Sequence, residues 1–310
     1  MKNTVQVFAP ASVANLSCGF DVLGLCLEGV GDTMSFQRTS DSGIKIFNKN
    51  NSSLPTDPKQ NVAGVAAQAL LDAHPIAGGV QIEIEKGILP GSGIGSSAAS
   101  AVGAVVGINQ LLEHPLPKQD LLPFALAGEA MASKDAHADN IAPALLGGII
   151  LVRSVYPMDL VKLPIPKDLF AVVLHPQIEL KTAEARALLG NQVLLKSAIQ
   201  QWANVGALVH ALHTDDDSLM ARSLQDVIAE PLRKKLIPEF DRIQKIALQE
   251  GALGCGISGA GPSIFSLVKG AEKSNNIAHA LSYFCNQKGI EHQLYTSPIN
   301  RNGVEIISAK

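Results

Sequence analysis

A glycine-rich loop at residues 89–99 carries the clearest chemical signal in the chain. Gly91, Gly93 and Gly95 alternate with other residues, so backbone N–H groups can approach a ligand without obstruction from Cβ atoms. We expect Ser96 or Ser97 to cap the alanine-rich helix that follows, and the N-terminus of a helix carries partial positive charge. A glycine loop that leads into a helix N-terminus is a ready phosphate site. The loop therefore predicts phosphate binding, and a glycine turn into a tightly packed helix is the alternative.

Three better-known motifs do not fit this loop. A P-loop of the form GxxxxGK[ST] needs a lysine, and no lysine follows here. A dinucleotide motif GxGxxG that begins at Gly91 requires glycine where Ser96 stands. The nucleophile elbow GxSxG lacks its final glycine, both in this loop and in the segment GISGA at residues 256–260. Hydrolysis by a Ser-His-Asp triad therefore has no support in the sequence.

Three charged residues are candidates for binding a metal ion or a carboxylate. Glu129 stands in an otherwise apolar run, and a buried carboxylate without a partner is costly, so we expect a cation or a donor beside it. An acid on the solvent face of a helix is the alternative. Arg186 and Arg233 carry planar guanidinium groups that can bind a carboxylate through two parallel hydrogen bonds. Taken alone, each arginine is more often a solvated charge on a helix.

Both halves of the chain contain strand and helix patterns, and several of the strands look like antiparallel pairs, which favours an α+β fold over a doubly wound sheet. Helices are expected at residues 61–73, 98–112 and 120–133. The first has its apolar residues on one face, whereas the second is apolar on nearly every face and should be buried. Prolines crowd residues 156–167 and indicate a boundary near residue 165. We therefore predict an N-terminal domain at residues 1–165 and a C-terminal domain at residues 166–310.

The composition excludes several classes of protein. The chain has 310 residues, of which 46% are hydrophobic and 17% charged, and its net charge is −3, so neither disorder nor nucleic-acid binding is expected. Its longest nearly apolar stretch, residues 141–152, is shorter than the about 20 residues of a membrane span, so no membrane partner is expected. The four cysteines form no CxxC pair, which favours reduced thiols and a cytoplasmic location.

Two further motifs accompany the loop. Ala9-Pro-Ala-Ser-Val-Ala-Asn-Leu-Ser-Cys-Gly-Phe-Asp21 lies near the N-terminus, and Gly256-Ile-Ser-Gly-Ala-Gly-Pro-Ser263 lies near the C-terminus. The three motifs in this order resemble those of the GHMP family of small-molecule kinases. The resemblance implies ATP, Mg²⁺ and a two-domain α+β architecture, with a ribosomal-S5-like N-terminal domain and a ferredoxin-like C-terminal domain. It implies that ATP is held by Leu89, Pro90, Gly91, Ser92, Gly93, Ile94, Gly95, Ser96, Ser97, Ala98 and Ala99, together with Asn61.

Further segments resemble the branch of the family that phosphorylates L-homoserine on the route to threonine. They are residues 14–16, 19–24, 137–143 and 230–233. The resemblance implies that Arg186 and Arg233 hold the carboxylate of homoserine and that Asp21 pairs with its ammonium group. The implied substrate residues are Asn15, Asp21, Asn140, Thr182, Arg186 and Arg233, the implied Mg²⁺ ligands are Ser97 and Glu129, and the implied catalytic residues are Asn140, Glu129 and Ser97.

Asn140 departs from the wider family, whose members often have aspartate here as a base. An asparagine side chain cannot take the proton, so we expect Asn140 to orient the hydroxyl while the proton leaves late, to the phosphate. Two other functions stay open: a related kinase for another small alcohol, and a catalytically silent nucleotide-binding module. Apolar edges in the second half also suggest a homodimer.

Overall fold

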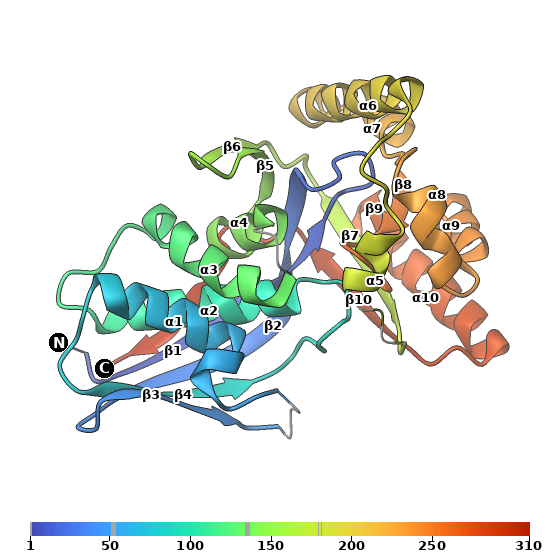
Figure 1. The fold of residues 1–310 in the computed structure, drawn as a ribbon. Coiled ribbons are helices and arrows are strands. Elements are labelled where there is room, and N and C mark those ends of the chain that lie inside the picture. Colours follow the sequence, from blue (N-terminus) through green and yellow to red (C-terminus); the bar gives the residue numbers. More distant parts are fainter. Residues whose placement is uncertain (1, 51–53, 134–136, 179, 181) are drawn as a thin grey trace.

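Two β-sheets, each with helices packed against it, build the fold of the computed structural model (Figure 1). The structure describes residues 2–50, 54–133, 137–178, 180 and 182–310. The mixture of sheet and helix in both halves confirms the predicted α+β class.

The first sheet is organised around its longest strand, β2. Its strands are β1 (Thr4–Ala14), β2 (Leu23–Thr39), β3 (Gly43–Asn48), β4 (Gly79–Glu85), β5 (Ile149–Ser154), β6 (Asp159–Leu163) and β11 (Glu305–Ala309). One edge of β2 pairs with β1, and its other edge pairs with β4 at residues 33–39 and with β5 at residues 23–25. Only β3 and β4 run parallel within the described residues, because helix α1 (Val62–Ala73) crosses over between them.

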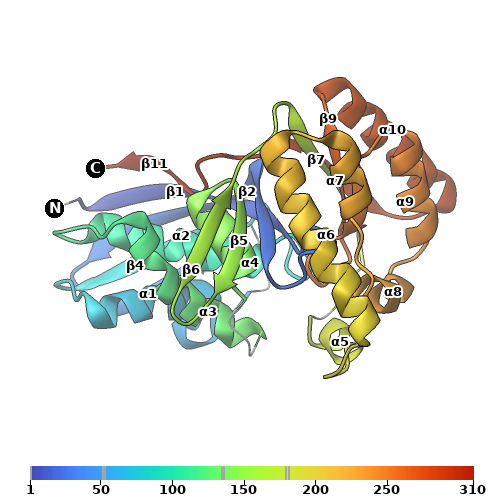
Figure 2. The same cartoon turned by 90° about the horizontal axis from the view of Figure 1, so that it is seen from above.

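Four helices cover one face of this sheet (Figures 1 and 2). They are α1, α2 (Ser96–Leu111), α3 (Leu122–Ser133) and α4 (Ala138–Leu146), and short 3₁₀ turns lie at Pro58–Gln60 and Lys118–Leu121. Helix α2 contacts both β1 and β2 and the other three helices, so it is buried on nearly every side, as its sequence predicts. The predicted helices at residues 61–73, 98–112 and 120–133 are therefore confirmed, whereas α4 was not predicted.

The second sheet is antiparallel, with strand order β10-β7-β9-β8. Its strands are β7 (Leu169–Pro176), β8 (Gly254–Ile257), β9 (Ile264–Lys269) and β10 (His292–Pro298). The helices are α5 (Thr182–Ala187), α6 (Leu195–Thr214), α7 (Asp217–Ser223), α8 (Glu230–Arg233), α9 (Phe240–Gln249) and α10 (Ala271–Lys288), with a 3₁₀ turn at Lys234–Leu236. Helices follow β7, and α10 separates β9 from β10, which gives the βαββαβ succession of a ferredoxin-like unit.

The last strand returns to the first sheet. β11 pairs with β1, so the two chain ends lie side by side (Figure 1). A further bridge joins Leu27 to Ile299. The predicted boundary near residue 165 stays a prediction, but residues 305–309 of the predicted second domain add a strand to the first sheet. Within the described residues no helix is both long and apolar enough to span a membrane.

Candidate active site

A cavity of about 930 Å³ collects side chains from both halves of the chain. It is bordered by the glycine-rich loop, by the turn after β1 and by residues of α3, α4, α5 and α8. The predicted site residues in its wall are Asn15, Asp21, Asn61, Pro90, Gly91, Gly93, Gly95, Ser96, Ser97, Glu129, Asn140, Arg186 and Arg233. Residues that are far apart in the sequence therefore meet at one site, as the motifs predict.

Six of the predicted residues lie elsewhere or are not described. Ser92, Ile94, Ala98 and Ala99 are buried away from the cavity, and Leu89 is partly exposed outside it. The side chain of Thr182 lies outside the described residues. Ser92 and Ile94 are buried, whereas the glycines on either side of them line the cavity. Ala98 and Ala99 are buried within α2.

The cap of α2 differs from the prediction. Gly95, in the left-handed conformation with φ +72°, is the N-cap residue, and no side chain of the described residues caps the helix. The prediction that Ser96 or Ser97 caps α2 is wrong, since both lie inside its first turn, where the Ser96 hydroxyl donates to the Ile88 carbonyl at 3.1 Å. An N-terminus without a capping side chain leaves backbone N–H groups available to an anion, which strengthens the phosphate prediction.

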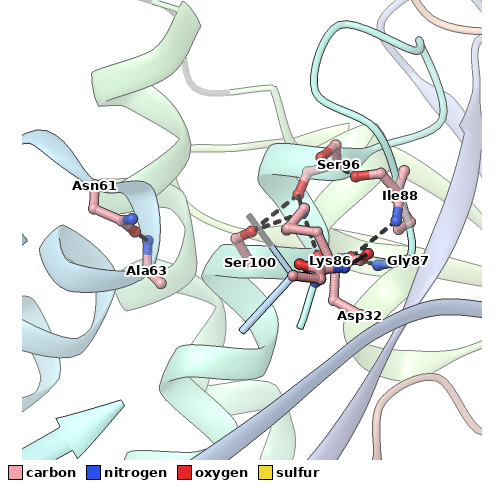
Figure 3. A network of polar contacts seen from close by, with 9 residues as sticks. Asp32, Asn61, Ala63, Lys86, Gly87, Ile88, Ser96 and Ser100 are labelled. Carbon is pink, nitrogen blue, oxygen red and sulfur yellow. Dashed lines mark hydrogen bonds and ion pairs between the residues drawn. The ribbon is translucent and has the colours of Figure 1, made fainter. Parts of the chain in front are cut away.

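A buried ion pair that the sequence analysis missed supports the start of α2 (Figure 3). Lys86 Nζ pairs with Asp32 and also donates to the Ser96 carbonyl and to the Ser100 hydroxyl, each at 3.1 Å. The other carboxylate oxygen of Asp32 accepts from two backbone N–H groups at residues 87 and 88. Burial raises the pKa of Asp32 and lowers that of Lys86, and the attraction between them opposes both shifts. The network therefore connects the end of β4, which leads into the glycine-rich loop, to the first turns of α2, which follows the loop.

The C-terminal glycine motif packs directly on the phosphate loop. The Ser258 hydroxyl donates to the Gly93 carbonyl at 2.7 Å, and the Ser263 N–H donates to the Ser92 carbonyl at 3.2 Å. A Cβ atom on Gly93 would lie 2.5 Å from the Gly261 carbonyl oxygen. The two glycine motifs therefore approach at backbone distance, which only a residue without a Cβ permits at this position.

Glu129 and Ser97 lie together in the cavity wall. The Glu129 side chain is 8% exposed, and Ser97 hydrogen-bonds to it from the first turn of α2. Burial raises the pKa of this carboxyl, and the hydrogen bond opposes the shift. One carboxylate and one hydroxyl beside a phosphate site suit Mg²⁺, which takes oxygen ligands and completes its shell with phosphates and water. Among the described residues, no group of three or more acidic, histidine or cysteine side chains is placed so that it could hold a metal ion.

A cationic cluster forms another part of the wall. The guanidinium carbons of Arg186 and Arg233 lie 5.3 Å and 5.1 Å from the ring centre of Phe20, within cation–π range. Arg186 also pairs with Asp21, at 2.6 Å between Nη1 and Oδ2. Arg233 is 4% exposed, and burial lowers its pKa, but a guanidinium group stays charged. Sequence reasoning missed Phe20, although it lies next to Asp21 in the N-terminal motif.

Asn15 connects this cluster to the C-terminal motif. It has φ +74°, and its side-chain oxygen accepts from the Asp21 N–H at 3.0 Å. Its amide nitrogen donates at 2.8 Å to the Gly259 carbonyl, which also accepts from Arg233 at 3.0 Å. A left-handed asparagine between two partners is a strained residue of the kind that clusters at functional sites. Its side chain therefore positions Asp21 and the loop at residue 259.

Asn61 has a role in its own helix. Its side chain caps α1 by accepting from the Ala63 N–H at 2.9 Å (Figure 3). It also donates to the Pro55 carbonyl at 2.7 Å. The cap fixes the end of α1 at the cavity, and the proposed contact with ATP stays a prediction.

Asn140 lies in the first turn of α4, beside two ionisable groups. Asp139 is 3% exposed, and burial, with the charge of Asp21 adding to it, raises its pKa to about 7. His137 Nδ1 lies 3.8 Å from an Asp21 oxygen. The N-terminus of α4 therefore places a neutral amide, a perturbed carboxyl and an imidazole at one edge of the cavity.

Glu230, behind the arginine cluster, gives a prediction about stability. Burial raises its pKa to about 7, so between pH 4.5 and 7 the native state binds a proton that the unfolded chain has lost. The free energy of unfolding contributed by this group therefore falls as pH rises through that range. Glu230→Gln stays neutral and keeps the oxygen that accepts from Gln244.

We expect Glu230→Gln to raise the Tm by about 2–6 °C at pH 8 and to change it little at pH 4.5. Thermal unfolding of the wild type and the variant across this pH range measures the difference. Glu113→Gln, on the surface, is the control and should follow the wild type at every pH. If the wild type and Glu230→Gln had the same Tm at pH 8, ionisation of the Glu230 carboxyl would not lower the stability of the native state, and the prediction would be wrong.

Comparison with known proteins places this site in a family. The model of the GHMP kinases N terminal domain matches residues 61–148, and that of the GHMP kinases C terminal domain matches residues 195–287. The chain belongs to the GHMP kinase family. Its fold is shared by a mevalonate kinase of L. major in complex with R-mevalonate, with a TM-score of 0.72, 19% identity, and coverage of 94% of this chain and 95% of that one.

Several relatives that are 35% or more identical over nearly the whole chain are homoserine kinases. The homoserine kinase of Chlorobium phaeovibrioides is 40% identical over 98% of this chain and 99% of its own length. That of Xanthomonas campestris is 36% identical over 98% of this chain and 94% of its own length. The crystal structure of homoserine kinase from Cytophaga hutchinsonii has a TM-score of 0.95 and 45% identity, and covers 99% of this chain and 98% of that chain.

Proposed function

We propose that the chain transfers the γ-phosphoryl group of ATP to the hydroxyl of L-homoserine, giving O-phospho-L-homoserine and ADP, a step towards threonine. One observation carries the proposal: Arg186, Arg233 and Asp21 share a single cavity with the phosphate loop. Full-length similarity to homoserine kinases supports the same reaction.

The charges of the cavity match the substrate. Homoserine offers a carboxylate and an ammonium group, and Arg186 next to Asp21 offers the complementary pair. Arg186 and Asp21 pair with each other at 2.6 Å. A zwitterion that binds between them replaces this ion pair by two, one between its carboxylate and Arg186 and one between its ammonium group and Asp21. Phe20 holds both guanidinium groups at similar distances, which limits their freedom before the substrate binds. A sugar carries no charged group with which this ion pair could exchange.

The nucleotide end of the cavity depends on backbone groups. The uncapped N-terminus of α2 and the glycine loop supply N–H donors for the phosphates, and the buried Lys86–Asp32 pair fixes their position. We propose that Mg²⁺ enters with ATP and is held by Glu129 and Ser97, where it would neutralise phosphate charge. The alcohol and the phosphoryl group are then held in line for transfer, which needs positioning more than covalent chemistry.

The decisive experiment measures ADP release with analogues of homoserine that each lack one charge. 4-Hydroxybutyrate lacks the ammonium group, and 3-aminopropan-1-ol lacks the carboxylate. We expect homoserine to be turned over and each analogue to lose about 10²–10⁴-fold in kcat/KM, because an analogue that separates Arg186 from Asp21 gives a new partner to only one of them. In Arg186→Met the preference for the carboxylate should shrink, whereas Arg242→Met, at an exposed arginine, should retain it.

Two outcomes would contradict the proposal. Turnover of mevalonate or galactose without turnover of homoserine would assign the site to another small alcohol. ATP binding without turnover of any acceptor would indicate a catalytically silent module.

We infer a cytoplasmic location, which the four buried free thiols support.

The homodimer also stays a prediction. Exposed apolar side chains around the start of α6 support it: Leu188, Val193, Leu194, Leu195, Ile199 and Trp202.

A further inference from the structure

We propose that Ser12 is a positioning residue that holds the Asn140 amide with its N–H groups towards the cavity, so that Asn140 acts in phosphoryl transfer only as a hydrogen-bond donor. The inference rests on the proposed function, because it assigns a role within the reaction. It concerns a serine that the sequence analysis did not select and that does not line the cavity itself.

The contact joins two distant parts of the chain. Ser12 lies on β1 and is 0% exposed, and its hydroxyl donates to Asn140 Oδ1 on α4 at 2.8 Å. The backbone N–H of Ser12 donates to the Ile94 carbonyl at 3.2 Å, so the same residue is also tied to the phosphate loop. Asn140 lines the cavity, whereas Ser12 lies behind it. The serine therefore acts on the reaction through the asparagine.

The hydrogen bond fixes which end of the amide faces the cavity. Among the described residues, Asn140 Oδ1 is the acceptor that the structure gives to the Ser12 hydroxyl. A flipped amide would place Nδ2 against the hydroxyl and leave the buried hydroxyl proton without that acceptor, which is unfavourable. With Oδ1 held by Ser12, Nδ2 is the end of the side chain left for the cavity, and no group of the described residues accepts from it.

The phosphate loop encloses this hydrogen bond. A Cβ atom on Gly95 would lie 2.3 Å from Ser12 Oγ and 3.1 Å from Asn140 Oδ1. The N-cap residue of α2 thus packs directly on the Ser12–Asn140 pair. The contact of Gly95 with the Ser12–Asn140 pair therefore positions both the phosphate loop and the Asn140 amide, which faces the acceptor alcohol.

A donor at this place excludes Asn140 itself as the acceptor of the alcohol proton. An amide N–H can hold the alcohol oxygen or an oxygen of the phosphoryl group, but it cannot accept a proton. The alcohol oxygen forms the new O–P bond, the bond between phosphorus and the β,γ-bridging oxygen breaks, and ADP leaves with that electron pair. The alcohol proton passes to an oxygen of the transferred phosphoryl group, as a loose transition state allows.

A double-mutant cycle tests the proposal. We expect Ser12→Ala to lower kcat about 10–100-fold, because a free amide rotates between two orientations, while the KM values for ATP and homoserine change less than about threefold. Ser12→Thr keeps a hydroxyl and should restore most of kcat. In an Asn140→Ala background, Ser12→Ala should have almost no further effect, since the residue through which it acts is gone.

Ser274→Ala is the matched control, because this serine is equally buried and its hydroxyl donates to a carbonyl, but it lies on α10. Thermal unfolding verifies that each variant folds. A wild-type kcat in Ser12→Ala, or an equal loss in both backgrounds, would overturn the positioning role. If the wild type bound ATP but did not turn over homoserine, the proposed function itself would be wrong. This outcome differs from a failure of the positioning role alone, in which the wild type remains active.

Discussion

Glu129→Gln is expected to lower kcat by about 10²–10⁴-fold at saturating homoserine and to leave the protein folded. The substitution keeps the size of the side chain and an oxygen that can accept from Ser97, but it removes the negative charge. Burial already raises the pKa of Glu129, so a neutral amide is tolerated there at least as well as the carboxylate. The loss should therefore fall on catalysis rather than on stability.

Steady-state rates at increasing Mg²⁺ concentration, with Tm measured in parallel, check this expectation. Glu85→Gln, at an exposed acid of β4, is the control and should behave as the wild type. If Glu129→Gln retained the wild-type kcat at every Mg²⁺ concentration, Glu129 would have no part in holding the metal. A lowered Tm with an unchanged rate per folded molecule would assign the residue to packing instead.

The elements that the sequence predicted best are those with a strong local pattern. Residues 61–73 show it as an apolar face that extends over three turns, and residues 98–112 show it as a nearly continuous run of apolar and small residues. Helix α4 was missed because Pro143 and the glycines after it suggest a break, although the proline lies inside the helix. The cap of α2 was assigned to a serine because serine is the commoner choice, and the left-handed Gly95 depends on packing that a sequence does not show.

The site was predicted from motifs, and its supporting contacts were not. Asp21, Arg186 and Arg233 were selected as separate partners of the substrate, whereas the structure pairs the first two and stacks both arginines on Phe20. Asp32 and Lys86 are 54 positions apart. Contacts of this kind depend on tertiary packing, and none follows from spacing along one strand or helix.

In the structure, each of the three motifs holds part of another motif in place. The N-terminal motif holds the Gly259 carbonyl through Asn15, and the C-terminal motif holds the Gly93 carbonyl through Ser258. Gly95 in turn packs on Ser12 of the N-terminal motif. The three motifs are thus parts of one backbone framework. Loss of any of these contacts should therefore weaken binding both at the phosphate loop and at the arginine cluster.

Gly93→Ala should show this dependence most strongly, with weak ATP binding and a loss of about 2–4 kcal/mol in the free energy of unfolding. Gly93 has φ +81°, and a Cβ atom there would lie 2.5 Å and 2.7 Å from the carbonyl oxygen and carbon of Gly261. These neighbours are backbone atoms and cannot rotate away as a side chain could, so the two glycine loops must separate. Separation would also break the hydrogen bond from Ser258 to the Gly93 carbonyl.

Gly29→Ala isolates the effect of the backbone conformation. Gly29 has φ +72°, but nothing lies within 4 Å of its Cβ position, so alanine there should cost only about 1–2 kcal/mol and leave ATP binding intact. Chemical denaturation and calorimetric titration with ATP compare the two variants. Gly93→Ala should raise the Kd for ATP at least about 10-fold, whereas an affinity within threefold of the wild type would mean that the loop binds phosphate without its contact to the C-terminal motif. The difference between the two alanines then measures how far phosphate binding depends on close approach of the two loops.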